Sequence, residues 1–124
     1  MKVLVLEDEF QLLKGSFDYL NTRFYNGTLH VDNYAKTQDF PNIKGINDYD
    51  KIFVDISLHR ASEQDGFSFL KSIRALVPNL KKIVIITGSD KVNQKLEEIG
   101  FSNIAVLPKP ITFLDLKSVM PAYP

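Results

Sequence analysis

The chain has 124 residues, of which 44% are hydrophobic, enough for one compact domain and too few for two. Its 15 basic and 15 acidic side chains cancel, so no overall positive field favours direct binding to nucleic acid. Cysteine is absent, which excludes disulfides, thiolate zinc sites and cysteine nucleophiles. The longest aliphatic runs, Val3–Leu6 and Ile83–Ile86, are too short to span a bilayer. We therefore expect a cytoplasmic protein with one domain over residues 1–124 and no membrane segment.

Five segments are predicted to be β-strands. Four are short, unbroken runs rich in Val, Ile and Leu, which are typical of parallel strands covered on both faces. They are Lys2–Leu6, Lys51–Ile56, Lys82–Thr87 and Ile104–Leu107. A weaker strand is expected near Leu29–Ala35, where apolar and polar residues partly alternate.

Helical patterns lie between these strands. Apolar residues at steps of three and four predict helices over residues 10–24, 67–77 and 92–99. Pro78 ends the second, and Ser89 or Asp90 is the expected N-cap of the third. Thr112 and Asp115 are expected to cap a short last helix. The stretch Thr37–Asp50 is ambiguous, because Pro41 and Gly45 allow only a short helix. Strands alternating with helices predict a three-layer α/β/α sandwich around a parallel sheet.

Polar side chains follow four of the strands, at the edge where open parallel sheets form their sites. Carboxylates follow the first strand (Glu7, Asp8 and Glu9) and end the central one (Asp55). Thr87 ends the next strand, and Lys109 follows the last. We expect these groups to converge.

Three gathered carboxylates repel one another unless a cation joins them, and hard oxygen ligands favour Mg²⁺. In such a site an aspartate can attack phosphorus, while the metal and Lys109 neutralise the transferring oxygens and Thr87 donates a hydrogen bond. Simpler interpretations exist for each part. Glu7–Glu9 could be solvated acids at a helix N-terminus, Asp55 and Lys109 a structural ion pair, and Thr87 an ordinary strand-end hydroxyl.

Five motifs in order resemble the receiver domains of two-component response regulators, of the kind without an output domain. They are the acids after KVLVL, Asp55 in KIFVDIS, the Asp65–Gly66 turn, Thr87 in IVIITGSD and Lys109–Pro110. The resemblance spans essentially the whole chain. It implies a flavodoxin-like sheet with strand order 2-1-3-4-5.

The resemblance also implies roles for individual residues. Asp55 would accept the phosphoryl group, Thr87 would be the switch hydroxyl and Lys109 the phosphate-binding cation, with a cis Lys109–Pro110 bond. Asp8 would ligate Mg²⁺ (or Mn²⁺) directly and Glu7 through water. The Asp55 carboxylate and the Ser57 backbone carbonyl would complete the ligands.

The implied function is phosphorylation of Asp55 by a histidine kinase or a histidine phosphotransfer protein. The domain would phosphorylate and dephosphorylate itself rather than act as a conventional enzyme. A downstream protein would bind the face made by the 92–99 helix, the last strand and the last helix. The chain is expected to be a monomer or a weak homodimer.

Three features depart from the family pattern. Val106 stands where an aromatic switch residue is common, so output would need another element. The loop from Asp55 to Gly66 is longer than usual, with added polar residues from His59 to Gln64. The last helix is predicted to be short.

These departures favour an alternative, a pseudo-receiver interaction module that phosphorylation does not regulate. Two other α/β classes fit less well. A flavodoxin needs a hydroxyl- and glycine-rich loop after the first strand, where this chain has acids. A haloacid-dehalogenase-type phosphatase needs a second Asp two residues after Asp8, where this chain has Phe10.

Overall fold

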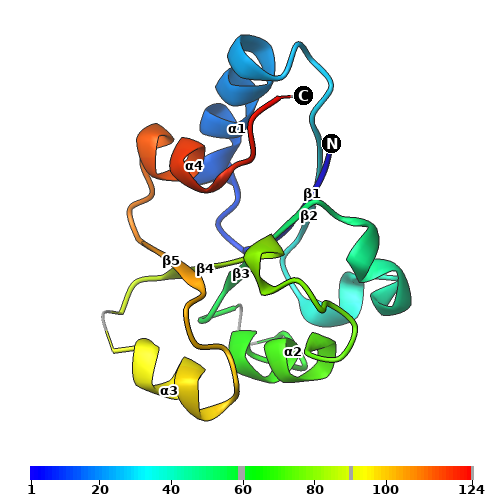
Figure 1. Ribbon diagram of the computed structural model, residues 1–124, viewed down its shortest axis with the longest axis vertical. Helices are drawn as coiled ribbons and strands as arrows, with labels where there is room; N and C mark the ends of the chain where they lie inside the picture. The colour runs from blue at the N-terminus through cyan, green and yellow to red at the C-terminus, as the bar shows by residue number, and fades with distance from the viewer. Residues whose placement is uncertain (59–60, 90, 124) are drawn as a thin grey trace.

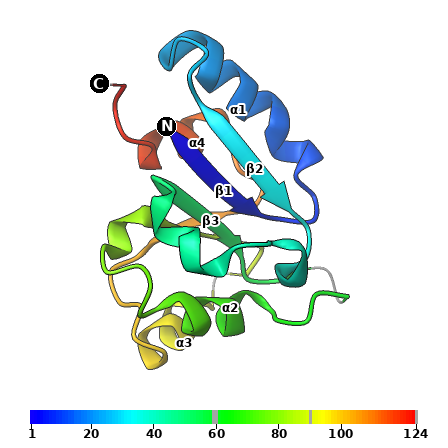
Figure 2. The same cartoon turned by 90° about the vertical axis from the view of Figure 1, so that its right-hand side faces the viewer.

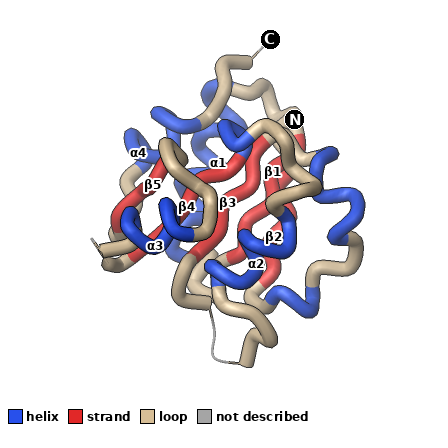
Figure 3. Tube along the Cα trace, turned by 60° about the horizontal axis from the view of Figure 1, so that its bottom comes forward, coloured by secondary structure: helices blue, strands red, loops and turns tan. Residues whose placement is uncertain are grey.

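Five parallel strands form a single sheet in the order β2-β1-β3-β4-β5. The computed structural model describes residues 1–58, 61–89 and 91–123. Figure 3 shows the strands side by side across the molecule. The predicted strands are all present, with ends shifted by no more than one residue: β1 (Lys2–Leu6), β2 (His30–Tyr34), β3 (Lys51–Asp55), β4 (Ile83–Thr87) and β5 (Ala105–Pro108).

Helices cover both faces of this sheet (Figures 1 and 2), as the sandwich prediction requires. One layer consists of α1 (Gln11–Phe24) and α4 (Phe113–Val119). The other layer contains α2 (Gly66–Ile73) and α3 (Asn93–Glu98). The chain also has three short 3-10 helices: η1 (Thr37–Asp39), η2 (Ile43–Asp48) and η3 (Leu80–Lys82). Within the described residues, no helix is both long and apolar enough to cross a bilayer.

Each layer has its own apolar core, because successive strand residues point to opposite faces. In β1, Val3 and Val5 belong to the cluster under α1 and α4, whereas Leu4 and Leu6 belong to the cluster under α2 and α3. All four are fully buried. This double burial explains why the central strands β1, β3 and β4 are unbroken apolar runs.

The helix ends differ from prediction in two places. The second helix ends at Ile73 rather than near Val77, although Val77 is still buried and bonded to the Ile73 carbonyl through its N–H in a turn. The prediction that Ser89 is the N-cap of the third helix is wrong, because α3 begins later, with Val92 at its N-cap position. The alternative N-cap, Asp90, lies outside the described residues.

The ambiguous segment between β2 and β3 contains only short helices, η1 and η2, in agreement with the expected effect of Pro41 and Gly45. At the other end of the chain, the predicted cap of α4 is confirmed. The Thr112 hydroxyl accepts from the Asp115 N–H while the Asp115 carboxylate accepts from the Thr112 N–H.

Gly66 closes the loop that follows β3 by packing directly on the backbone of Asp55. A Cβ at this position would lie 2.4 Å from the Asp55 carbonyl oxygen and 2.6 Å from the Ile56 Cα. The Gly66 N–H also donates to the Ile56 carbonyl oxygen at 3.1 Å. Only glycine allows α2 to start this close to the end of the central strand.

We predict that Gly66→Ala lowers the free energy of unfolding by about 1–3 kcal/mol, the usual cost of forcing atoms into a filled space. Gly15→Ala is the matched control. Gly15 lies in α1 with no atom within 4 Å of its added Cβ. The control should stabilise the protein by about 0.5–1 kcal/mol through helix propensity. Urea unfolding measures both, and a Gly66→Ala variant as stable as wild type would contradict the packing argument.

Candidate functional site

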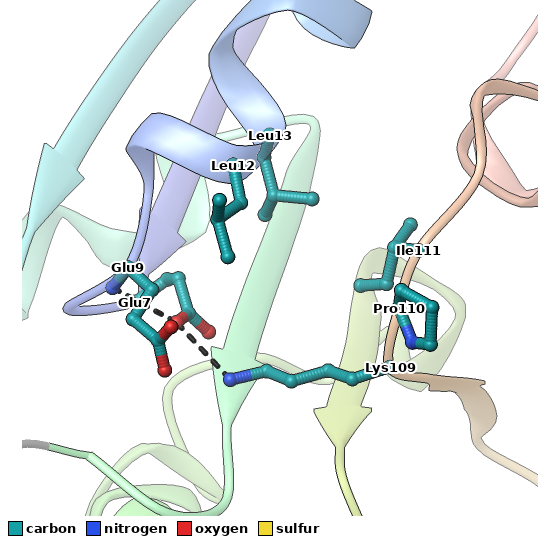
Figure 4. A pocket seen from close by; sticks show the side chains of 7 residues that line it. All are labelled: Glu7, Glu9, Leu12, Leu13, Lys109, Pro110 and Ile111. Carbon is teal, nitrogen blue, oxygen red and sulfur yellow. Dashed lines mark hydrogen bonds and ion pairs between the residues drawn. The ribbon is translucent and has the colours of Figure 1, made fainter.

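The carboxyl ends of β1, β3 and β5 bring together three of the predicted site residues. Lys109 extends from the end of β5 across the sheet edge, as Figure 4 shows for its approach to Glu7. Its amine Nζ lies 2.9 Å from Asp55 Oδ2 and 3.1 Å from Glu7 Oε1. One amine therefore bridges two carboxylates that are far apart in the sequence.

Both carboxylates are buried. Asp55 is 0% exposed and Glu7 is 1% exposed, whereas Asp8 is exposed. Carboxylate oxygens of Glu7, Asp8 and Asp55 all lie within 4.8 Å of one another. Among the described residues, Glu7 Oε2 is the buried side-chain oxygen or nitrogen that has no hydrogen-bond partner.

Backbone groups hold the two buried acids in place. The Ser57 N–H donates to Asp55 Oδ1 at 2.9 Å, and the Glu9 N–H donates to Glu7 Oε1 at 2.9 Å. Asn33, on β2, donates from Nδ2 to the backbone carbonyl oxygen of Glu7 at 3.0 Å. Sequence analysis missed Asn33, although a polar amide inside a predicted strand was an available signal.

The crowding of negative charge changes the protonation of Glu7. Burial, reinforced by the neighbouring Asp55 carboxylate, raises the pKa of Glu7 from 4.5 to about 7. Burial alone would lower the pKa of Lys109, but the Asp55 and Glu7 carboxylates outweigh it and raise that pKa. Lys109 therefore stays charged, and Glu7 takes up a proton more readily than an exposed glutamate.

Thr87 lies beside the acids at the end of β4, but its hydroxyl is engaged elsewhere. It donates to the Ser89 carbonyl oxygen at 3.1 Å and accepts from the Ser89 N–H at 2.9 Å. The backbone carbonyl of Thr87 accepts from the Lys109 N–H at 2.8 Å and so fixes the base of the lysine side chain. The structure thus brings Thr87 to the site without directing its hydroxyl at Asp55.

Two clefts flank Lys109. One, of about 510 Å³, is lined by acids and apolar side chains of α1 and the β5–α4 loop: Glu7, Glu9, Leu12, Leu13, Pro110 and Ile111 (Figure 4). The other, of about 600 Å³, is lined by Thr87, Gly88, Ser89, Lys91 and Pro108. The Lys109 side chain is therefore partly open to solvent, with 30% of it exposed.

The donor set fits a hard divalent cation. Three carboxylates face one amine, so the cluster has excess negative charge, and the unpartnered Glu7 Oε2 leaves a buried acceptor free. The exposed Asp8 would leave the ion open to water, as Mg²⁺ prefers. The Asp55–Lys109 ion pair considered above is present, but one lysine does not compensate both buried acids.

No protein-family model matches the sequence, and no curated protein is significantly similar to it in sequence. Solved structures are similar in fold. A signal receiver domain of a DNA-binding response regulator from Colwellia psychrerythraea superposes with a TM-score of 0.71 and 17% identity over 95% of this chain and 93% of that one. A CheY-like receiver domain protein from Methanospirillum hungatei superposes with a TM-score of 0.69 and 18% identity, over 94% of this chain and 87% of that one. Vibrio cholerae chemotaxis protein CheY4 superposes with a TM-score of 0.69 and 19% identity, over 94% of this chain and 92% of that one.

This chain has the receiver-domain fold. The observed strand order 2-1-3-4-5 is the one that the family resemblance implied. At these identities the similarity establishes the fold, and the chemistry of the site depends on the residues described above.

Several features noted in the sequence can be located in the structure. Val106 lies half-buried on the edge strand β5 and packs against the core under α2 and α3. The last helix, α4, has 7 residues and is short, as predicted. The Lys109–Pro110 bond is cis, also as predicted. Within the long loop after Asp55, residues 59–60 lie outside the described part of the chain.

The raised pKa of Glu7 predicts a pH-dependent stability. The folded state keeps this proton up to about pH 7, whereas an unfolded glutamate releases it near 4.5. Between these values the folded state binds more protons, so this contribution to stability is full at low pH and is lost as pH rises. The limiting slope is about 1.4 kcal/mol per pH unit for one proton.

Urea unfolding from pH 4.5 to 8 in the presence of a chelator measures this slope. Glu7→Gln, which cannot ionise, should flatten it and be more stable than wild type at pH 8. Glu9→Gln, at the neighbouring exposed acid, should keep the wild-type slope. Equal slopes for wild type and Glu7→Gln would show that Glu7 titrates normally.

Proposed function

We propose that the chain is a phosphoacceptor receiver that takes a phosphoryl group from a phosphohistidine onto Asp55. The observation that supports this most is a buried carboxylate, Asp55, paired with the partly exposed Lys109 beside two more acids. A purely structural ion pair needs one acid for one amine, and burying further carboxylates without compensation is costly. A cluster arranged in this way is suited to receive a cation and a phosphoryl group.

In the proposed reaction an Asp55 carboxylate oxygen attacks phosphorus. The new O–P bond forms as the N–P bond of the phosphohistidine breaks, and the bonding electron pair stays on the imidazole nitrogen. Lys109, already within 2.9 Å of Asp55 Oδ2, supplies positive charge to the phosphoryl oxygens. The Ser57 N–H, bonded to Oδ1, keeps the carboxylate in a fixed orientation.

Glu7, Asp8, Asp55 and the Ser57 backbone carbonyl would hold Mg²⁺, or Mn²⁺ in its place. The ion supplies neutralisation of charge on the phosphoryl oxygens. In its absence, the three carboxylates of Glu7, Asp8 and Asp55 itself repel a phosphate group.

The phosphodonor in this proposal is a histidine kinase or a histidine phosphotransfer protein. The output is a conformational change that alters binding of a downstream protein to the face made by α3, β5 and α4. Thr87 acts as the switch hydroxyl, turning from Ser89 toward the phosphoryl group. Val106 has no ring to rotate, so the aromatic switch common in the family has no counterpart here.

Phosphorylation is directly measurable. In Mg²⁺ with a small phosphodonor such as acetyl phosphate, intact mass spectrometry should detect one added phosphoryl group. Asp55→Asn should abolish it, and Lys109→Ala should slow it by about 100-fold, the usual loss for one electrostatic stabiliser. Glu9→Gln, an exposed acid next to the cluster, is the control and should react like wild type.

The same experiment decides between this proposal and a pseudo-receiver that phosphorylation does not regulate. An unchanged mass for wild type, or a phosphoryl group that persists in Asp55→Asn, would refute the proposed function. The half-buried Val106 favours the pseudo-receiver, because it removes one route from the site to the output face.

A further inference from the structure

Both ends of the long loop between β3 and α2 contact Asp55. At its start, the Ser57 N–H donates to Asp55 Oδ1 at 2.9 Å. At its end, Gly66 packs on the Asp55 carbonyl oxygen. A movement at either end of this loop therefore changes a contact with Asp55.

The middle of the loop is fastened to η1, in the segment between β2 and β3. The Thr37 N–H donates to Ser62 Oγ at 3.0 Å, and the two hydroxyl oxygens are 3.2 Å apart. Ser62 Oγ donates its own hydrogen to the Gln64 carbonyl oxygen at 2.7 Å, so the Thr37 hydroxyl is the donor to Ser62. Thr37 Oγ1 also accepts from the Gln64 N–H at 3.3 Å. Thr37 is only 7% exposed, so these groups satisfy one another away from water.

Gln38 forms a second attachment one residue further on. Its Nε2 donates to the Ala61 carbonyl oxygen at 2.7 Å, and its Oε1 accepts from the Glu63 N–H at 2.8 Å. One side-chain amide thus holds the backbone of the loop on both sides of Ser62. Unlike Thr37, Gln38 is exposed, so its replacement removes the attachment without opening the core.

We propose that Thr37 and Gln38 are positioning residues for the phosphoacceptor site. By fixing residues 61–64 of the loop, they limit the positions available to Ser57, whose backbone carbonyl is the expected Mg²⁺ ligand. The inference rests on the proposed function, because its effect is on ion binding and phosphoryl transfer at Asp55.

The physical basis is the conformational entropy of the loop. Ser57 is exposed, and among the described residues the contacts that restrain its loop are its own N–H bond to Asp55, the packing of Gly66 and the attachment to η1. A free loop must lose backbone entropy each time its carbonyl is placed on the ion. An attached loop has lost most of that entropy on folding, and the ion then binds more tightly.

The test uses Thr37→Val, which keeps the shape of the side chain and removes its hydroxyl, and Gln38→Ala. Phosphorylation by acetyl phosphate is followed by intact mass as a function of Mg²⁺ concentration, and Mg²⁺ binding without phosphodonor is measured by isothermal titration calorimetry. Each variant should need about tenfold more Mg²⁺ for half-maximal rate, the lower end of the effect of residues that orient metal ligands. The rate at saturating Mg²⁺ should stay close to wild type, because Asp55 and Lys109 are intact.

Two controls separate positioning from general destabilisation. Thr37→Ser keeps the hydroxyl and should restore the wild-type Mg²⁺ dependence. Asp39→Asn lies on the same 3-10 helix, and its side chain forms no hydrogen bond or ion pair with the described residues, so it should change nothing. Circular dichroism confirms that each variant is folded at the assay temperature. The exposed Gln38→Ala carries the test if Thr37→Val unfolds.

The outcomes distinguish the two proposals. A wild-type protein that takes up no phosphoryl group refutes the proposed function and this inference together. A phosphorylated wild type whose Mg²⁺ dependence is unchanged in Thr37→Val and Gln38→Ala refutes the inference alone. A loss of rate that Thr37→Ser does not restore, or that Asp39→Asn shares, also refutes it.

Discussion

Two buried carboxylates share one amine at the carboxyl edge of the sheet, and the rest of the site depends on this imbalance. Glu7 and Asp55 both bond to Lys109, whose side chain is partly in solvent. One positive charge cannot neutralise two buried negative ones, so Glu7 retains a proton or another cation joins the cluster. Burial, reinforced by the neighbouring Asp55 carboxylate, raises the pKa of Glu7, and the same buried acids fit a divalent ion.

The sheet creates this imbalance because the side chains at the carboxyl ends of β1 and β3, Glu7 and Asp55, are buried. β1 and β3 are neighbours with parallel register, Leu6 opposite Val54, so the next residues, Glu7 and Asp55, emerge together. Helices cover both faces of the sheet here, so these two side chains are almost completely shielded from solvent. Burial that makes the apolar strands stable therefore also brings the acids together. Lys109 relieves part of their repulsion, and a proton on Glu7 or a bound cation relieves the rest.

The sequence predicted best what depends on local pattern. Unbroken apolar runs located four strands and partial alternation located β2, each to within one residue, and the Thr112 capping box located the start of α4. Val77 was placed in a helix because hydrophobic periodicity reports burial, and Val77 is buried. Periodicity does not report where the regular helix stops, which is at Ile73. The bonds between Thr37 and Ser62 were not foreseen. They join polar residues of two loops, and neither hydrophobic period nor turn chemistry indicates which loops meet.

A switch needs an element with two alternative arrangements, and in the proposed function the hydroxyl of Thr87 would be that element. Both of its hydrogen bonds within the described residues are to the backbone of Ser89, and the Ser89 hydroxyl in turn accepts from the Lys91 N–H at 3.2 Å. In the proposed reaction, a hydroxyl that donates to a phosphoryl oxygen can no longer donate to the Ser89 carbonyl. Releasing Ser89 disturbs the connection to α3, which starts at Asn93. A backbone route of this kind requires no rotating ring, so Val106 on β5 is compatible with a working switch.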